Sequence, residues 1–235
     1  MSNIAASIVI GGVIIAGGIL LKTPVERKPA VKNNLDGVVI PVVWGDLGLK
    51  LVESGVIDVE KFIGMYEGRG QFTDEYRRLL LDKDNDQLKV TKENAGFLLN
   101  VLWALGLGNK SPILEEGEMA NPRYGGAGNF ASTGGWTLAR GQAMDHYSMH
   151  GIIELTPEEE RLVDKVSRKI TRPCCSNSAH FPDCNHGMAM LGLLELMASQ
   201  GMSEEEMHRN AILVNSYWFP GYYDEAPSSS GGCSV

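Results

Sequence analysis

Hydrophobic and polar positions first separate an apolar segment near the amino terminus from the rest of the chain. Residues 4–21 contain no charged side chain. Eighteen residues in a helix extend about 27 Å, which approaches the thickness of the hydrocarbon core of a bilayer. No basic residue precedes this run, and no clear small-residue cleavage site follows it. We therefore predict a transmembrane anchor at residues 1–21, with a cleavable signal peptide as the alternative.

The basic residues after this segment bear on the orientation of the anchor. Lys22, Arg27, Lys28 and Lys32 all follow the apolar run. The positive-inside rule would place the domain behind them in the cytoplasm. A short anchor followed by a linker with prolines and lysines is also a common tether for a domain outside the cell. We expect a single-pass membrane protein with an extracytoplasmic domain on the basis of the linker, although the charges favour the opposite orientation, so the orientation stays open.

The polar and apolar pattern beyond the anchor predicts one folded domain between two flexible segments. Residues 22–37 are polar and contain two prolines, which is typical of a linker. Residues 226–235 consist largely of Ser and Gly and offer little to bury, so we predict a disordered tail. The domain is therefore expected at residues 38–225.

Helical spacing dominates within that domain. Residues 91–105 place apolar side chains on one helical face, and helices are also expected over residues 136–150 and from 183 or 185 to 200. Capping boxes at Thr156 and Ser203 mark two further helix starts. Strand patterns are limited to residues 37–43 and 151–155, and residues 117–135 are predicted to form a long glycine-rich loop. The fold class is therefore mainly α, with one helical domain behind the anchor.

The charge of the chain limits the partners that can be expected. The net charge is −8, and the 21 Lys and Arg residues are scattered singly along the sequence. Proteins that follow a phosphate backbone carry a basic stripe instead. We expect no nucleic acid partner. The predicted anchor makes the membrane a partner, and protein partners remain unknown.

Residues 173–186, PCCSNSAHFPDCNH, hold three of the four cysteines and two of the five histidines of the chain. Thiolate and imidazole are the ligands that zinc, copper and iron prefer, so we predict a transition-metal site without choosing among these metals. The candidate ligands are Cys174, Cys175, His180, Cys184 and His186. Cys184 and His186 fall at a predicted helix start, where the helix dipole stabilises a thiolate. A disulfide from Cys174 or Cys175 to Cys184, or three buried thiols, are the alternatives.

Two other patterns suggest metal ligands with less specificity. His146 and His150 are four residues apart, so on a helix they would share a face and could join the cysteine site. Residues 82–93 place carboxylates at the spacing of a calcium-binding EF-hand loop. Gln87 occupies the position where that loop requires glycine, so a solvated turn before a helix is the main interpretation and calcium a minor one.

The segment from Pro173 to Cys184 also resembles the PCYCGC-motif proteins, an extracellular bacterial family in which a proline precedes clustered cysteines. The resemblance covers about a dozen residues, and this chain has adjacent cysteines where the family alternates them. It implies an anchored, extracytoplasmic protein with a metal or redox role, and it names no catalytic residue.

The sequence therefore predicts a membrane-anchored protein that binds a transition metal through a cysteine and histidine cluster. A thiol- or metal-dependent redox enzyme and an interaction protein stapled by a disulfide are the rival hypotheses. No arrangement of nucleophile, base and orienting residue stands out, so catalytic residues remain unknown.

Overall fold

The computed structural model describes residues 37–223. The predicted anchor at 1–21, nearly all of the predicted linker and the predicted tail at 226–235 lie outside the described residues. Within residues 37–223 the fold is mainly helical with one two-stranded sheet, as predicted. No helix in this part of the chain is both long enough and apolar enough to cross a membrane.

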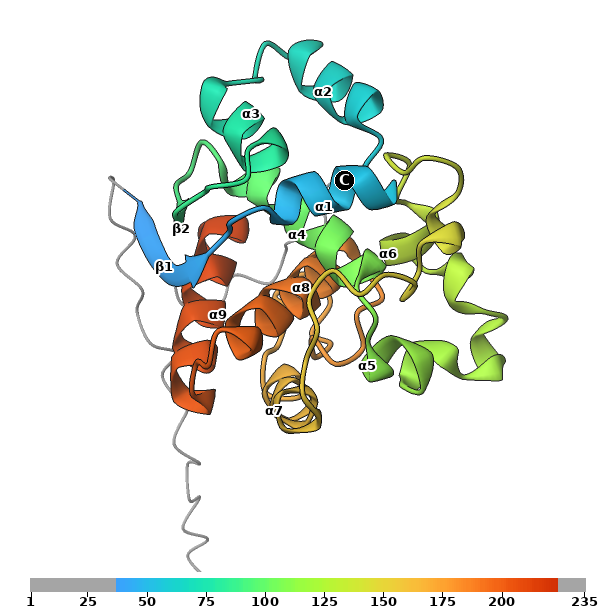
Figure 1. Ribbon diagram of the computed structural model, residues 1–235. Coiled ribbons are helices and arrows are strands. Elements are labelled where there is room, and N and C mark those ends of the chain that lie inside the picture. The colour runs from blue at the N-terminus through green and yellow to red at the C-terminus, as the bar shows by residue number, and fades with distance from the viewer. Residues whose placement is uncertain (1–36, 224–235) are drawn as a thin grey trace, which may run out of the picture.

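Two apolar helices cross at the centre of the domain (Figure 1). They are α4 (Ala95–Gly108) and α8 (Asn185–Ser199), and nearly every side chain of each is buried. The crossing requires glycine, because a Cβ on Gly106 would lie 2.0 Å from the carbonyl oxygen of Met188. A Cβ on Gly192 would lie 2.5 Å from the carbonyl oxygen of Leu102. This close contact of two backbones fixes the position of α8, whose first turn carries the candidate site.

Amphipathic helices cover this central pair. α7 and α9 pack against α8, and α1 packs against α3 and α4. The capping boxes predicted at Thr156 and Ser203 are confirmed, with each hydroxyl accepting from a backbone N–H three residues later. The bounds of these helices are α1 (Leu47–Ser54), α2 (Val59–Glu67), α3 (Asp74–Leu81), α7 (Pro157–Ser167) and α9 (Glu204–Trp218).

The sheet pairs the predicted amino-terminal strand with a segment that was expected to form a turn. β1 (Val38–Val43) runs antiparallel to β2 (Gln87–Val90), with Val38 opposite Val90. The EF-hand interpretation of residues 82–93 gains no support, because the carboxylates of this segment form no ligand cluster among the described residues. The amide of Asn85 donates to the carbonyl oxygens of Gly45, Arg78 and Asp82, so it closes the turn before the strand.

Three stretches differ from the predicted elements. Residues 136–150 do not form a helix beyond the single turn η4 (Ala143–Asp145), because Gly141 and Ser148 have positive φ angles of 80° and 57°. Residues 151–155 form no strand. The glycine-rich segment and its approach contain short helical turns rather than only loop: α5 (Pro112–Glu115), η1 (Glu118–Ala120), η2 (Pro122–Tyr124), η3 (Ala127–Asn129) and α6 (Ala131–Gly134).

Candidate metal centre

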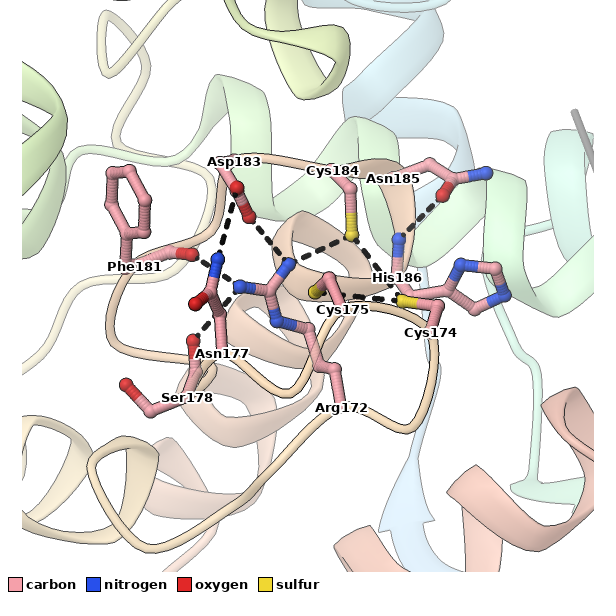
Figure 2. Close-up of polar contacts among 10 residues, drawn as sticks. All are labelled: Arg172, Cys174, Cys175, Asn177, Ser178, Phe181, Asp183, Cys184, Asn185 and His186. Atoms are coloured by element: carbon pink, nitrogen blue, oxygen red, sulfur yellow. Dashed lines mark hydrogen bonds and ion pairs between the residues drawn. The ribbon is translucent and has the colours of Figure 1, made fainter. Parts of the chain in front are cut away.

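The site is built by a tight loop that joins α7 to α8. The backbone N–H of Arg172 donates to the carbonyl of Asn177, and the N–H of Ser176 donates to the carbonyl of Arg172. Ser176 closes this turn with a positive φ of 59°. The turn carries Cys174 and Cys175 back to Cys184, the residue that immediately precedes α8 (Figure 2).

Four side chains of the cysteine and histidine cluster come together around the start of α8. Ligand atoms of Cys174, Cys184 and His186 all lie within 4.8 Å of one another, and so do those of Cys175, Asp183 and Cys184. The Sγ of Cys174 lies 3.7 Å from that of Cys175 and 3.9 Å from that of Cys184. A tetrahedral ion with metal–sulfur bonds of about 2.3 Å separates its sulfur ligands by about 3.8 Å. These two sulfur–sulfur distances fit a tetrahedral ion, whereas Cys175 and His186 fall in different ligand groups.

None of these three cysteines is in a disulfide. Their Sγ–Sγ separations exceed a disulfide bond of about 2.05 Å by more than 1.5 Å. The disulfide considered as an alternative, from Cys174 or Cys175 to Cys184, is therefore absent from this structure. The same separations leave the thiols close enough to form such a bond on oxidation.

A fully buried arginine lies beneath the cysteines. Nη1 of Arg172 donates to Asp183 Oδ1 at 2.7 Å and to Cys184 Sγ at 2.8 Å, and Nη2 donates to the carbonyls of Ser178 and Phe181 (Figure 2). Burying a guanidinium is costly unless negative charge and acceptors surround it. Asp183 and the Cys184 sulfur provide the negative partners.

The contacts of Cys184 favour its thiolate. The neighbouring Cys174 thiol contributes most, followed by the His186 ring, the Arg172 charge and the backbone N–H of Gly187, and together they lower the pKa of Cys184 to about 3 against the effect of burial. For Cys175 burial dominates and raises the pKa of its thiol. At neutral pH the cluster therefore holds one preformed thiolate, the protonation state that a metal ligand or a nucleophile requires.

His186 completes the cluster. Its ring packs against Phe219, with ring centroids 4.4 Å apart, and against Trp218. Nδ1 of His186 is buried, and no group among the described residues meets it with hydrogen-bond geometry. A buried nitrogen without a well-aligned partner normally costs free energy, which a ligand beside the ring would recover.

The other predicted histidines lie elsewhere in the described domain. His180 turns away from the cysteines, and its Nε2 lies 2.8 Å from Oδ1 of Asp164 on α7. Nδ1 of His146 lies 2.9 Å from Nε2 of His150, and Nε2 of His146 contacts the carbonyl of Arg140 at 2.7 Å. The expectation that these two share a helix face is wrong, because no helix forms there. His146, His150 and His180 do not belong to the ligand clusters of the described residues.

Two residues of the site were not predicted from the sequence, namely Arg172 as the buried cation and Asp183 as its carboxylate partner. Asp183 was considered only as a helix cap. Arg172 stands two residues before the cysteines, but a single arginine near a proline is usually solvated, and no local pattern distinguishes it. Only the folding of the loop over the start of α8 buries its guanidinium.

Comparisons of the chain with protein-family models, with curated proteins and with solved structures found no match. The resemblance to the PCYCGC-motif proteins therefore stays a hypothesis from the sequence. The geometry of this cluster is the basis for any statement about function.

Proposed function

We propose that this protein binds a transition metal through Cys174, Cys184 and His186, with Cys175 as the fourth donor. The observation that carries the proposal is the convergence of three donor groups within 4.8 Å of one another at the start of α8. Thiolate and imidazole together suit zinc, copper or iron rather than calcium or magnesium, which prefer oxygen ligands.

The surroundings of the cluster support binding of a cation by thiolates. Three thiolates around a divalent ion leave one negative charge, and Arg172 lies 2.8 Å from the Cys184 sulfur with a compensating positive charge. Hydrogen bonds to ligand sulfur also tune the site, as outer partners of metal ligands usually do. The unpartnered Nδ1 of His186 would gain an interaction on metal binding.

Metal content of the full-length chain in detergent, purified without a histidine tag and measured by mass spectrometry, tests the proposal. We expect about one ion per chain. Because Cys184 and His186 are both ligands, Cys184→Ser and His186→Ala should each weaken binding by at least tenfold in a competition with a chromophoric chelator.

His180→Ala provides the matched control, since it removes an imidazole from the same loop that contacts Asp164 instead. It should retain the metal. A folded wild-type protein that takes up no zinc, copper or iron after reconstitution would refute the proposal, and so would equal losses from His180→Ala and His186→Ala.

A thiol redox function is the second candidate, favoured by the pKa of Cys184 and by the 3.9 Å between Cys174 and Cys184. The Cys184 thiolate would attack a substrate disulfide and release one substrate thiolate, which takes up a proton. The deprotonated Cys174 sulfur would then attack the mixed disulfide, forming a Cys174–Cys184 disulfide and releasing the second thiolate. Trapping of a mixed disulfide in Cys174→Ser with a model disulfide would favour this function, and its absence would reject it.

We also propose that residues 1–21 anchor the domain to a membrane and that the domain lies outside the cytoplasm. The uncharged run at residues 4–21 supports the anchor, and the linker composition supports the orientation. Resistance of the full chain to carbonate extraction tests the anchor. Digestion of the domain by protease added to intact cells tests the orientation, and protection would reverse it.

A further inference from the structure

A large cleft opens beside the candidate metal centre. It has a volume of about 790 Å³, and its walls come from α2, α3, α4, the loop after α6 and the first turn of α8. This volume falls in the range of about 300 to 1,000 Å³ that is typical of sites for small organic molecules. At one end the cleft is lined by Asn185 and by His186, a member of the candidate ligand cluster.

The floor of the cleft is aromatic and held in place. Its rings belong to Tyr66, Tyr76, Phe97, Trp103 and Trp136. Tyr76 stacks on Phe97 with centroids 4.0 Å apart, and Trp103 meets Trp136 at 4.9 Å. Each indole N–H donates to a backbone carbonyl, so these rings are oriented before any ligand arrives. These rings belong to the core and expose only 1% to 8% of their surface, and the part that borders the cleft suits a planar, apolar ligand.

The rim of the cleft carries an excess of positive charge. Arg69 and Lys92 line it, together with a single carboxylate, Glu93. Neither Arg69 nor Lys92 forms an ion pair within residues 37–223, whereas the exposed lysine and arginine residues on α7, directly after it and on α9 are paired. Two cations against one carboxylate leave an excess of positive charge at the cleft, which favours an anionic group on the ligand.

We infer that this cleft binds a small aromatic molecule that carries a carboxylate or a similar anion. The ring system lies over the aromatic floor, the anionic group faces Arg69 and Lys92, and the opposite end of the molecule reaches His186. The contact with His186 would make this molecule the substrate or effector of the metal centre. Only this part of the inference rests on the proposed function. Binding itself depends on the cleft alone.

The chain offers a pair of glycines that test the cleft directly. A Cβ on Gly96 would meet nothing within 4 Å, and Gly96 lines the cleft on α4. Gly96→Phe should therefore fill the cleft without a clash in the core. Gly64 on α2 is equally open but does not line the cleft, so Gly64→Phe is the matched control.

The experiment titrates 2-naphthoate into the full-length protein in detergent, with empty micelles as blank, and follows quenching of tryptophan fluorescence. We expect saturable binding of one molecule per chain, abolished in Gly96→Phe and unchanged in Gly64→Phe. Replacing both Arg69 and Lys92 with Gln should weaken binding at least tenfold. Replacing Lys83 and Lys110 with Gln changes the net charge equally and should leave binding unchanged.

No saturable binding by the wild type, or binding that survives Gly96→Phe, would overturn the inference. Equal affinity for the neutral 2-naphthalenemethanol would overturn the assignment of an anionic ligand. The titration is run on metal-free protein and again on protein loaded with Co²⁺. A shift of the cobalt absorption bands on saturation is expected from the link to His186. Binding without such a shift overturns the contact between the ligand and the metal centre but supports ligand binding in the cleft. Failure of the protein to bind cobalt counts against the proposed metal centre and not against the cleft.

Discussion

Helix α8 carries one fully buried acidic group and begins beside a second that is partly buried, and the surroundings of the two lead to opposite protonation states. Cys184 precedes its first turn, and Glu195 lies in its second half with no exposed surface. The thiol of Cys184 contacts Cys174 and the buried guanidinium of Arg172. The carboxyl group of Glu195 receives a hydrogen bond from the amide of Asn109, and its Oε1 has no well-aligned partner among the described residues.

The difference shows that charged and hydrogen-bonding neighbours, rather than burial, determine which acid ionises. Burial raises the pKa of Glu195 to about 8, only partly offset by Ser111 and Asn109. Burial acts in the same direction on Cys184, but the Cys174 contact, His186 and Arg172 outweigh it and lower the pKa to about 3. At pH 7 the Cys184 thiol is therefore ionised, although in water a thiol is a weaker acid than a carboxyl group, and the Glu195 carboxyl group keeps its proton.

The two groups contribute opposite dependences of stability on pH. The folded pKa of Cys184 lies below that of an unfolded cysteine, so its contribution grows as pH rises from about 3 to about 8.5 and is lost on acidification. The folded pKa of Glu195 lies above that of an unfolded glutamate, so its contribution is complete below about pH 4.3 and is lost as pH rises to about 8.

Arg172→Met should remove most of the contrast and has the largest expected effect. It leaves Asp183, the Cys184 thiolate and two backbone carbonyls without their donor, so we expect a loss of about 3 to 5 kcal/mol in the free energy of unfolding. The pKa of Cys184 should rise. Urea denaturation measures the first effect, and the pH dependence of Cys184 alkylation by iodoacetamide, followed by peptide mass spectrometry, measures the second.

Arg168→Met is the control for this variant, since Arg168 forms an exposed ion pair with Asp164. Such pairs contribute at most about 1 kcal/mol. If Arg168→Met and Arg172→Met had equal effects on stability and on alkylation, the role assigned to the buried guanidinium would be wrong.

Glu195→Gln should remove the contribution of Glu195 to the pH dependence of stability and leave that of Cys184. The amide needs no proton and fills the same space, so the variant is expected to be more stable than wild type by about 3 to 5 kcal/mol at pH 8 and nearly equal to it at about pH 4. Thermal denaturation across this pH range measures the difference. Glu158→Gln, which changes an exposed residue of α7, should show neither effect.

Thr156→Ala has the smallest expected effect and separates helix capping from thiolate chemistry. α7 begins with a complete capping box, whereas Cys184 makes no side-chain capping bond to α8. Loss of the Thr156 hydroxyl should cost about 1 kcal/mol in the free energy of unfolding. Thr156→Ser should restore it, and neither variant should change the alkylation of Cys184. A changed alkylation profile would show that α7 and the site are coupled.

Local signals in the sequence predicted much of the framework of the fold. Thr156 with Glu159, and Ser203 with Glu206, gave the starts of α7 and α9, and the apolar spacing after Thr91 gave α4. Prediction failed where a turn depends on distant partners. Residues 87–90 form strand β2 because β1 pairs with them across the sheet, and His146 and His150 lie outside any helix because positive φ angles at Gly141 and Ser148 interrupt it.

The sequence by itself determined that thiols and imidazoles gather near the start of an apolar helix, since both the cluster and the helix signals are local. Only the tertiary structure decided which of them meet. The turn at residues 172–177 brings Cys174 to Cys184, whereas His180 points to Asp164. It also decided that Arg172 is buried beside the Cys184 sulfur and that Glu195 is buried without an ion pair to any residue between 37 and 223. Protonation depends on neighbours within a few ångströms, and these come from segments that are separate in the chain.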